Sequence, residues 1–327
     1  MKALVTGSTG FVGSHLVEKI LERGYEVRCF LRPDTRLDYI NNLPVELFRG
    51  DYSNSESLKK AVDDVDYVFH VGGVTKSKTK NGYFEGNYLP TVKLLEAVLS
   101  NNLSLRRFVL ISSQAAVGPG HSSQPVNEET PCHPITTYGV SKLKAEEKCL
   151  SVKDKLPITI IRPPAVYGPR DKDIFEFFKS ASKHVIAISG FGRKILSLVH
   201  VYDLVEGIII AAENPQAAGQ IYFIANSEIY DWDTIANLTK QIIGKWTITV
   251  RVPHLAIFSI AAISELVSRI QGRAALINFE KARDMVQKNW ACSPAKAERE
   301  LGYKAKLTIR AGIENTIQWY KENKWIH

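Results

Sequence analysis

The stretch VTGSTGFVGSHL, residues 5–16, decides the fold of this chain. It joins a short apolar run at residues 2–6 to an amphipathic run at residues 11–24, with three glycines at the junction. We expect Gly7 to make the tight turn, Gly10 to let the backbone approach a pyrophosphate, and Gly13 to let helix and strand pack closely. The first turn of the helix would offer unpaired N–H groups to phosphate oxygens. In this strand–helix setting the glycines predict a dinucleotide-binding loop, whereas an isolated triplet would also fit a purely structural turn.

Short apolar runs alternate with amphipathic runs over the first half of the chain. Strands are predicted at residues 2–6, 26–31, 45–50, 66–71, 106–112 and 157–162, with helical spacing of apolar residues between most of them. This alternation predicts an α/β fold, a Rossmann-type doubly wound parallel sheet with helices on both faces. The rhythm loosens after residue 168. We therefore predict an NAD(P)-binding domain at residues 1–168 and a smaller α/β substrate-binding region at residues 169–327, segments of which can fold back onto the first domain.

The composition is that of an ordinary globular protein, with 45% apolar and 23% charged residues. No apolar signal region precedes the first strand, and the longest apolar stretch, residues 255–267, is too short to cross a bilayer. Four scattered cysteines predict thiols in a reducing compartment and no metal site. We expect a cytoplasmic protein with a small-molecule substrate and no nucleic-acid partner. The net charge of +8 arises in residues 240–327; a solvated surface explains it, and an anionic ligand or membrane would also suit it.

The second predicted strand indicates which nicotinamide dinucleotide would bind. NAD sites usually place an acid at the end of this strand, where it holds the ribose 2′-hydroxyl. Here that position is Leu31, and Arg32 follows, with Arg36 nearby. A guanidinium can bind a 2′-phosphate, so the sequence favours NADP over NAD. Asp34 and Asp38 lie close enough to keep NAD open, and Arg32 could also be a solvent-facing residue that touches no ligand.

A tyrosine and a lysine stand four residues apart in TTYGVSKLKAEE, residues 136–147. On a helix this spacing brings Tyr138 and Lys142 to the same face. The pattern is frequent by chance and would also fit two residues on a solvated face, so its meaning depends on the rest of the chain.

Nine motifs follow one another in the order and spacing of one family: TGSTGFVG, GDYSNSESL, VDYVFHVGG, EGNYLPT, FVLISSQAAVG, YGVSK, IIRPPAVYGP, LVHVYDLVEG and LGYKAKLTIRAGIENTIQWY. On these residues the chain resembles the extended short-chain dehydrogenase/reductase superfamily, the NAD-dependent epimerase/dehydratase family, over nearly its whole length. VRCFLRP, FHVGG and LSLVHV look most like its dihydroflavonol-reductase and 3β-hydroxysteroid-dehydrogenase-like branch.

The resemblance implies a catalytic set of serine, tyrosine and lysine. Tyr138 would be the general acid/base, Lys142 would lower the pKa of its phenol and hold the nicotinamide ribose, and Ser113 would hold the substrate oxygen. Alternatively, Ser113 caps the end of a strand and Lys142 is a solvated helix lysine. His70 and His200 are expected in packing rather than in catalysis. The cofactor-binding residues implied by position are Gly7, Thr9, Gly10, Phe11, Val12, Gly13, Arg32, Asp51, Tyr52, Val71, Gly72, Gly73, Asn87, Tyr138, Lys142, Pro163 and Val166.

Two reaction classes of the resembled family share this catalytic set. One is hydride transfer between a nicotinamide cofactor and a hydroxyl/ketone substrate; the other is nucleotide-sugar epimerisation or dehydration. Nucleotide-sugar enzymes commonly have an asparagine where this chain has Ala165, and a diphosphate-binding arginine where it has Leu196. Arg170, Arg193 or Lys194 could compensate. We expect an oxidoreductase and keep the epimerase or dehydratase as the alternative. A cofactor-sensing regulator is disfavoured, because the tyrosine and the lysine are both present.

Two further features leave alternatives open. The apolar stretch at residues 255–267 suits a lid over a lipophilic substrate and, equally, an ordinary buried helix. Relatives in the resembled family often dimerise through the helix that carries the tyrosine and lysine and the helix before it. KLLEAVL (residues 93–99) and KLKAEEKCL (residues 142–150) could supply such a homodimer, although the charges of the latter leave a monomer open.

Overall fold

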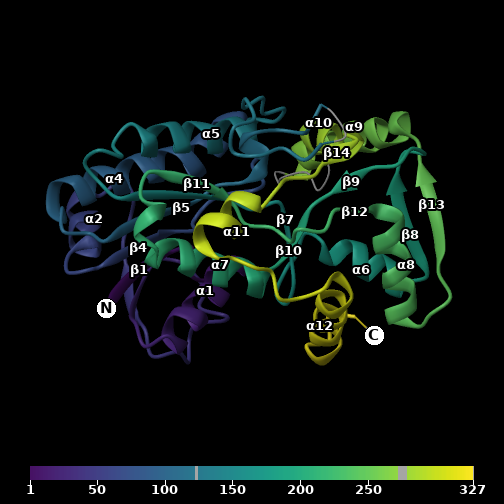
Figure 1. The fold of residues 1–327 in the computed structure, drawn as a ribbon. Coiled ribbons are helices and arrows are strands. Elements are labelled where there is room, and N and C mark those ends of the chain that lie inside the picture. Colours follow the sequence, from purple (N-terminus) through teal and green to yellow (C-terminus); the bar gives the residue numbers. More distant parts are fainter. Residues whose placement is uncertain (122–123, 272–277, 327) are drawn as a thin grey trace.

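A computed structural model describes residues 1–121, 124–271 and 278–326 of the chain. Its core is a seven-stranded parallel sheet in the spatial order β11-β6-β5-β4-β1-β2-β3 (Figure 1). In chain order its strands are β1 (Lys2–Thr6), β2 (Glu26–Leu31), β3 (Glu46–Arg49), β4 (Tyr67–His70), β5 (Arg107–Ile111), β6 (Ile158–Arg162) and β11 (Gln220–Phe223). The six strands predicted from the sequence are all present, each within one residue at either end. The Rossmann-type doubly wound fold is thereby confirmed.

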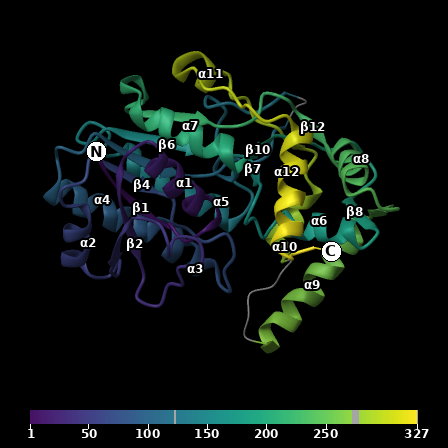
Figure 2. The same ribbon diagram turned by 90° about the horizontal axis from the view of Figure 1, so that it is seen from below.

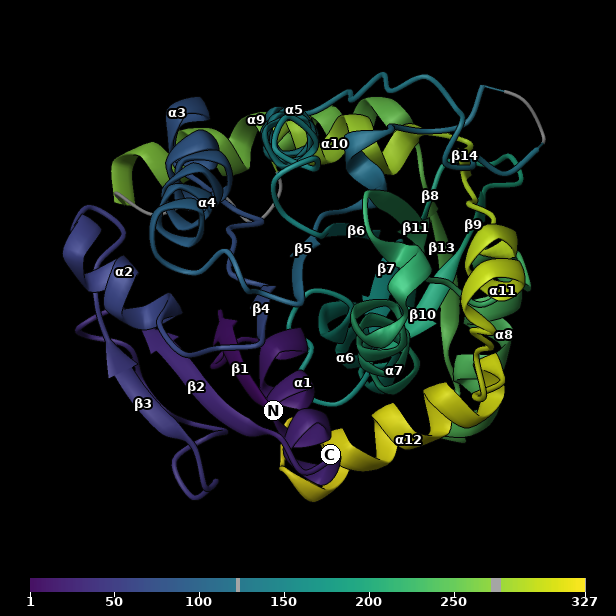
Figure 3. The same ribbon diagram turned by 60° about the vertical axis from the view of Figure 1, so that its left-hand side comes forward.

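Helices cover both faces of the sheet, so its strands read as nearly unbroken apolar runs. On one face lie α1 (Phe11–Glu22), α7 (Val201–Glu213) and α11 (Ala295–Leu301), which share a buried cluster with β1 and β2. On the other lie α2 (Ser55–Val62), α4 (Leu89–Asn101) and α5 (Thr137–Leu150) (Figure 3). The short α3 (Lys80–Tyr83) runs through a π-helical turn, Phe84–Tyr88, into α4. Single 3₁₀ turns occupy Gln114–Ala116 and Pro215–Ala217.

The elements beyond the sheet surround a separate apolar cluster. Its helices are α6 (Phe175–Ser182), α8 (Trp232–Ile243) and α12 (Ile309–Glu322). Three small sheets accompany them: β7 (Ala165–Tyr167) with β10 (Leu198–His200); β8 (Val185–Ser189) with β13 (Ile248–Val252); and β9 (Ile195–Leu196) between β12 (Tyr230–Asp231) and β14 (Asn289–Trp290). Chain segments after residue 168 also join the first unit, since β11 pairs with β6 and α7 packs on α1.

Two helices of the C-terminal half belong to neither helix layer of the large sheet. They are α9 (His254–Gln271) and α10 (Phe279–Val286), which pack against each other through a small apolar cluster. Among the described residues, none of the helices has both the length and the apolar character needed to cross a membrane. The four cysteines are free thiols; Cys29, Cys149 and Cys292 are buried and Cys132 is partly buried.

Candidate active site

The glycine loop lies at the carboxyl end of β1, against the loop that follows β4. Gly7 has a φ of +67°, which L-residues with a side chain rarely adopt. A Cβ on Gly7 would lie 2.7 Å from both Cα and N of Gly72, and a Cβ on Gly13 would lie 2.1 Å from the Gly7 oxygen. Gly10 is the N-cap of α1 and supplies no side-chain cap. The first turn of α1 is therefore left open to an anion, which fits a dinucleotide pyrophosphate.

Ser113, Tyr138 and Lys142 meet at the same edge of the sheet. Ser113 follows β5, and Tyr138 and Lys142 lie one turn apart in α5. Gly139 lets the two segments approach, because a Cβ there would lie 2.3 Å from the oxygen of Ala115. The Ser113 hydroxyl interacts with the phenol of Tyr138 and also accepts the N–H of Ala115 at 3.2 Å. Ser113 thus caps its turn and reaches the tyrosine at once.

The two titratable groups of this cluster are shifted in opposite directions. Burial raises the pKa of Tyr138 from 10.0 to about 12; the hydrogen bond with Ser113 opposes this rise, and the carboxyl of Asp284 adds to it. Burial lowers the pKa of Lys142 from 10.5 to about 8, and the carboxylate of Glu146 opposes that change. The predicted lowering of the phenol's pKa by Lys142 is not among these main contributions. Perturbed pairs of this kind are typical of functional sites.

Buried polar contacts with the large sheet hold Lys142 and its helix, α5, in place. The buried Nζ of Lys142 donates to the backbone oxygen of Ile111, at the end of β5, at 2.6 Å. One turn further along α5, the buried Glu146 accepts from the Ser112 hydroxyl and from Arg162, whose Nη2 lies 2.6 Å from Oε2. This ion pair ties α5 to β5 and β6. The position of Lys142 is therefore fixed by buried polar contacts rather than by solvated helix geometry.

Other predicted cofactor residues line the same edge. Val71, Gly72 and Gly73 follow β4, and the Gly72 N–H donates to the hydroxyl of Thr6 at 3.1 Å. Asn87, in the π-helical turn, is buried; it bonds both backbone groups of Val74 and donates to the Ser141 hydroxyl at 2.9 Å. Asn87 thereby ties the loop after β4 to α5. Pro163 follows β6, and Val166 lies in β7. Ligands of open α/β sheets bind at such carboxyl edges.

The residues predicted to bind the adenosine end of the cofactor form a basic, exposed surface. Arg32 follows β2, and its backbone oxygen accepts from Arg49 at 3.3 Å; Arg49 ends β3 and also donates to Pro33. Tyr52 lies near Arg32, whose charge opposes the rise in the pKa of Tyr52 to about 12 caused by burial. The exposed carboxylate of Asp51 accepts the Ser53 N–H, which lowers the pKa of Asp51. Arg49 is a second guanidinium that the sequence did not single out.

Helix α10 reaches the tyrosine from the C-terminal half, which the sequence did not predict. Glu280 accepts from the backbone N–H of Thr137 at 3.1 Å and from its hydroxyl. Burial raises the pKa of Asp284 to about 6, and its Oδ1 is buried with no hydrogen-bond partner among the described residues. The ring of Tyr83 packs edge-on against Tyr138 with centroids 6.3 Å apart. The charge of a largely buried carboxyl on α10 therefore acts on the proposed acid/base.

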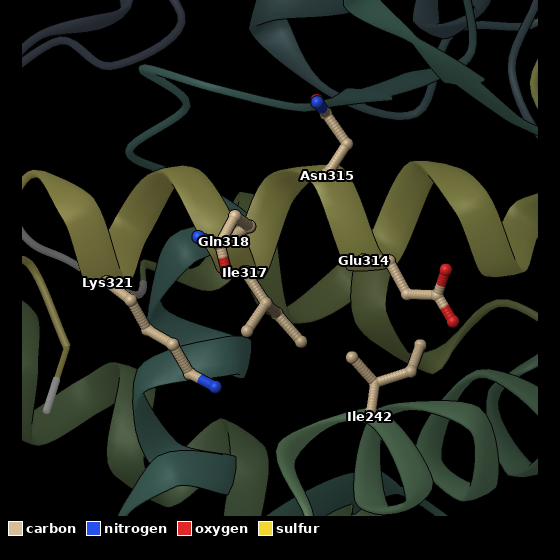
Figure 4. Close-up of a pocket in the computed structure, with 6 residues that line it drawn as sticks. All are labelled: Ile242, Glu314, Asn315, Ile317, Gln318 and Lys321. Carbon is tan, nitrogen blue, oxygen red and sulfur yellow. The ribbon is translucent and has the colours of Figure 1, made fainter.

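His70, His200 and a hollow between α8 and α12 lie outside this cluster. His70 is buried between the hydroxyls of Thr6 and Thr91, and burial lowers its pKa to about 3. His200 caps α7, and burial likewise lowers its pKa to about 3. Both fit the packing role expected of them. A hollow of about 410 Å³ between α8 and α12 is lined by Ile242, Glu314, Asn315, Ile317, Gln318 and Lys321 (Figure 4). None of these is a predicted site residue, so we place the chemistry at the sheet edge.

The residues that could replace a diphosphate-binding arginine are already engaged. Leu196 is buried in the separate apolar cluster that α6, α8 and α12 surround. Arg170 bonds the carboxylate of Glu18 at 2.7 Å, and Arg193 bonds Asp231 at 3.1 Å. Lys194 is buried and donates to the Ser189 hydroxyl and the Met285 oxygen at 2.8 and 2.7 Å. Each of the three cationic side chains at these positions thus already has a partner within the protein.

Proteins of similar sequence and similar fold are known. A sequence model of the NAD-dependent epimerase/dehydratase family matches residues 3–225. The chain is 24% identical to a ceramide reductase from Caulobacter vibrioides, with 98% of this chain and 95% of that protein covered. It is 28% identical to a 3β-hydroxysteroid dehydrogenase/Δ5→4-isomerase from Mycobacterium tuberculosis, with 98% and 90% covered. A UDP-glucuronic acid 4-epimerase from Bacillus cereus, solved in complex with NAD, shares the fold with a TM-score of 0.80 at 24% identity, over 99% of each chain.

Proposed function

The chain belongs to the NAD-dependent epimerase/dehydratase family, and from this premise we propose that it transfers a hydride between NAD(P) and a hydroxyl/ketone substrate. One observation carries the proposal: the Tyr138 phenol, bonded by Ser113 and one turn from the buried Lys142, stands at the carboxyl edge of the sheet beside the glycine loop. This is the set of groups that proton transfer to a ketone oxygen requires.

Bound NAD(P) would supply or accept the hydride, and in its oxidised form its positive charge would join the Lys142 ammonium in favouring the phenolate. In the reducing direction Tyr138 donates its proton to the ketone oxygen as that oxygen gains negative charge. In the oxidising direction the phenolate takes the proton of the substrate hydroxyl. Ser113 donates a hydrogen bond to the same oxygen and holds it beside the phenol. Lys142 also holds the nicotinamide ribose.

The proposed substrate lacks a nucleotide diphosphate. Arg170 and Arg193 are each paired with a carboxylate, and the ammonium of Lys194 makes two hydrogen bonds inside the protein. Freeing the buried Lys194 for a diphosphate would leave its partners without a charge-assisted bond, which costs about 1.5–3 kcal/mol, whereas the exposed Arg193–Asp231 pair would cost at most about 1 kcal/mol to break. The likeness to a ceramide reductase and to a 3β-hydroxysteroid dehydrogenase favours a lipophilic alcohol or ketone instead.

We propose NADP as the preferred cofactor. Arg32 follows the second strand, Arg49 donates to the backbone oxygen of Arg32, and Leu31 stands where an acid would hold the 2′-hydroxyl of NAD. Two guanidinium groups there would bind a 2′-phosphate. We propose a cytoplasmic protein. A homodimer through α4 and α5 also stays a proposal; the outward faces of these helices carry the ion pairs Lys93–Glu96 and Lys144–Glu147.

Turnover of NADPH and NADH with a panel of hydrophobic ketones and alcohols tests the activity. Tyr138→Phe should lower kcat by about 10²–10⁴-fold and leave the affinity for NADPH nearly unchanged. Tyr202→Phe, at an exposed ring outside the cluster, is the matched control and should keep full activity. Epimerisation of a UDP- or dTDP-sugar, or a Tyr138→Phe variant with wild-type kcat, would contradict the proposed reaction.

A further inference from the structure

One side of helix α9 is apolar and exposed to solvent. Its exposed large residues, each between 43% and 80% exposed, are Leu255, Ile260, Ile263, Leu266 and Val267, which we call the α9 face. Their spacing places them along one side of the 18-residue helix, together with Ser259 and Ala262, and between residues 255 and 267 no charged residue lies among them on that side. The helix projects from the body of the molecule (Figure 2). An apolar strip of this extent marks an interaction site.

The opposite side of α9 is apolar as well and holds the helix in place. Ile257 and Ala261 are buried against Ala282 of α10. The one carboxylate of α9, Glu265, accepts the backbone N–H of Phe279 at 2.9 Å and so belongs to this inner side. The α9 stretch is therefore not the ordinary buried helix that was one reading of its sequence. Both sides of α9 are apolar, but the rest of the protein covers only one of them.

Exposed positive charge lies on and just after α10, the helix that packs against α9. Lys281, Arg283 and Lys288 are exposed on and just after α10, and within the described part of the chain none of them forms an ion pair. Glu280 is bound to Thr137, and Asp284 is buried towards the site. These two carboxylates thus face the protein, whereas Lys281, Arg283 and Lys288 face solvent.

We propose that the α9 face docks this protein onto an anionic membrane surface. The apolar side chains would enter the boundary between headgroups and acyl chains, and the three cations would lie against acidic headgroups. A second copy of the chain is the poorer occupant. A twofold contact through this face would bring Lys281, Arg283 and Lys288 towards their own copies, and like charges repel.

Docking there would bring the membrane close to the candidate site. Helix α10 lies between α9 and α5: Ala282 packs on α9, while Glu280 bonds Thr137 and Asp284 acts on Tyr138. A lipophilic substrate could then pass from the bilayer towards the tyrosine. This consequence rests on the proposed function, whereas the docking itself does not.

Vesicle co-sedimentation of the full chain, without cofactor or substrate, tests the docking independently of any activity. Phosphatidylcholine vesicles containing phosphatidylglycerol should bind on the order of 100-fold more tightly than phosphatidylcholine alone, since each of three cations contributes about fivefold. Binding should weaken as salt is added. The double variant Ile263→Glu with Leu266→Glu should bind at least about tenfold more weakly, because it removes apolar insertion. Lys281→Gln with Arg283→Gln should lose roughly 25-fold on the anionic vesicles only.

Leu103→Glu is the matched control, since Leu103 is 68% exposed in the turn after α4 and should leave vesicle binding unchanged. Thermal melting should show every variant folded, because all the altered side chains are exposed. Three results would overturn the proposal: a folded protein that ignores phosphatidylglycerol vesicles, binding that the Ile263 and Leu266 changes leave intact, or a dimer that these changes break without any vesicle binding.

Discussion

Replacing Gly7 with alanine should destabilise the protein more than replacing Gly24, although both glycines adopt the left-handed conformation. Their φ angles are +67° and +77°. Beside Gly24 nothing lies within 4 Å of the position that a Cβ would occupy, whereas at Gly7 that Cβ would lie 2.7 Å from the backbone of Gly72. Gly24→Ala therefore measures backbone strain alone, and Gly7→Ala adds a backbone clash.

The two effects can be given magnitudes. Left-handed backbone costs a residue with a Cβ about 1–2 kcal/mol. Forcing an extra methyl group against packed backbone adds about 1–3 kcal/mol, which gives roughly 2–5 kcal/mol for Gly7→Ala. A chain of 327 residues has an unfolding entropy near 0.7 kcal/mol/K, so each kcal/mol lowers Tm by about 1.5 °C. We expect Tm to fall by about 2–3 °C for Gly24→Ala and by about 3–7 °C for Gly7→Ala.

Differential scanning calorimetry of both variants checks these values, and fluorescence titration with NADPH checks the site. Because the clash pushes the glycine loop away from Gly72 and Gly73, Gly7→Ala should weaken cofactor binding at least about tenfold. Gly24→Ala lies outside the loop and should bind as the wild type does. Equal losses of Tm, or equal cofactor affinities, in the two variants would refute the close approach of these loops.

Three further predictions concern charges. Glu146→Gln leaves the buried guanidinium of Arg162 without its carboxylate, which should cost about 3–5 kcal/mol of stability in denaturant titration; a loss below 1 kcal/mol would contradict a structural ion pair. Burial raises the pKa of Asp284 from 3.8 to about 6, so between these pH values the folded protein keeps a proton that the unfolded chain releases. Raising the pH through this window should therefore lower the stability of the protein, by up to about 3 kcal/mol at 1.36 kcal/mol per pKa unit. Thermal melts across the window should show that Asp284→Asn abolishes this pH-dependent loss of stability. The same variant also removes a carboxyl that raises the pKa of Tyr138. Arg32→Ala should weaken NADPH binding about 10-fold and leave NADH nearly unchanged in parallel titrations; equal changes for the two cofactors would argue against a 2′-phosphate contact.

The sheet could be predicted from the sequence because its strands are buried on both faces. Residues 26–31 and 107–111 are short runs made mostly of apolar residues between amphipathic helices, and each forms a strand, although Arg28 and Arg107 interrupt the apolar pattern. The two-residue strands β9, β12 and β14 are too short to show any period. The stretch at 255–267 shows the limit of reading burial from apolarity, since half of that helix faces solvent. Which side of an apolar helix finds a partner depends on tertiary packing.

Some residues of the candidate site could likewise be predicted from the sequence, and others could not. Ser113, Tyr138 and Lys142 were expected together from the resemblance of their motifs to one family, while helix spacing by itself places only Tyr138 and Lys142 on a common face. Asp284 could not, because it meets Tyr138 only after the C-terminal half folds over α5, and no local pattern marks it. Arg49 was missed because only the parallel register of β3 with β2 sets it beside residue 31. Contacts made by long-range pairing have no signature in a single sequence.

The strand β11, which closes the sheet beside β6, makes the cofactor half of this protein unsuitable as a portable module. A fragment ending at residue 168 would lack β11 and would leave the N–H and C=O groups along one side of β6 unpaired. It would also strip α7 from the apolar face of α1. An open, apolar sheet edge recruits strands from other chains and promotes aggregation. Grafting a new specificity onto this scaffold therefore calls for exchanging surface segments such as α9 and α10 within an intact chain.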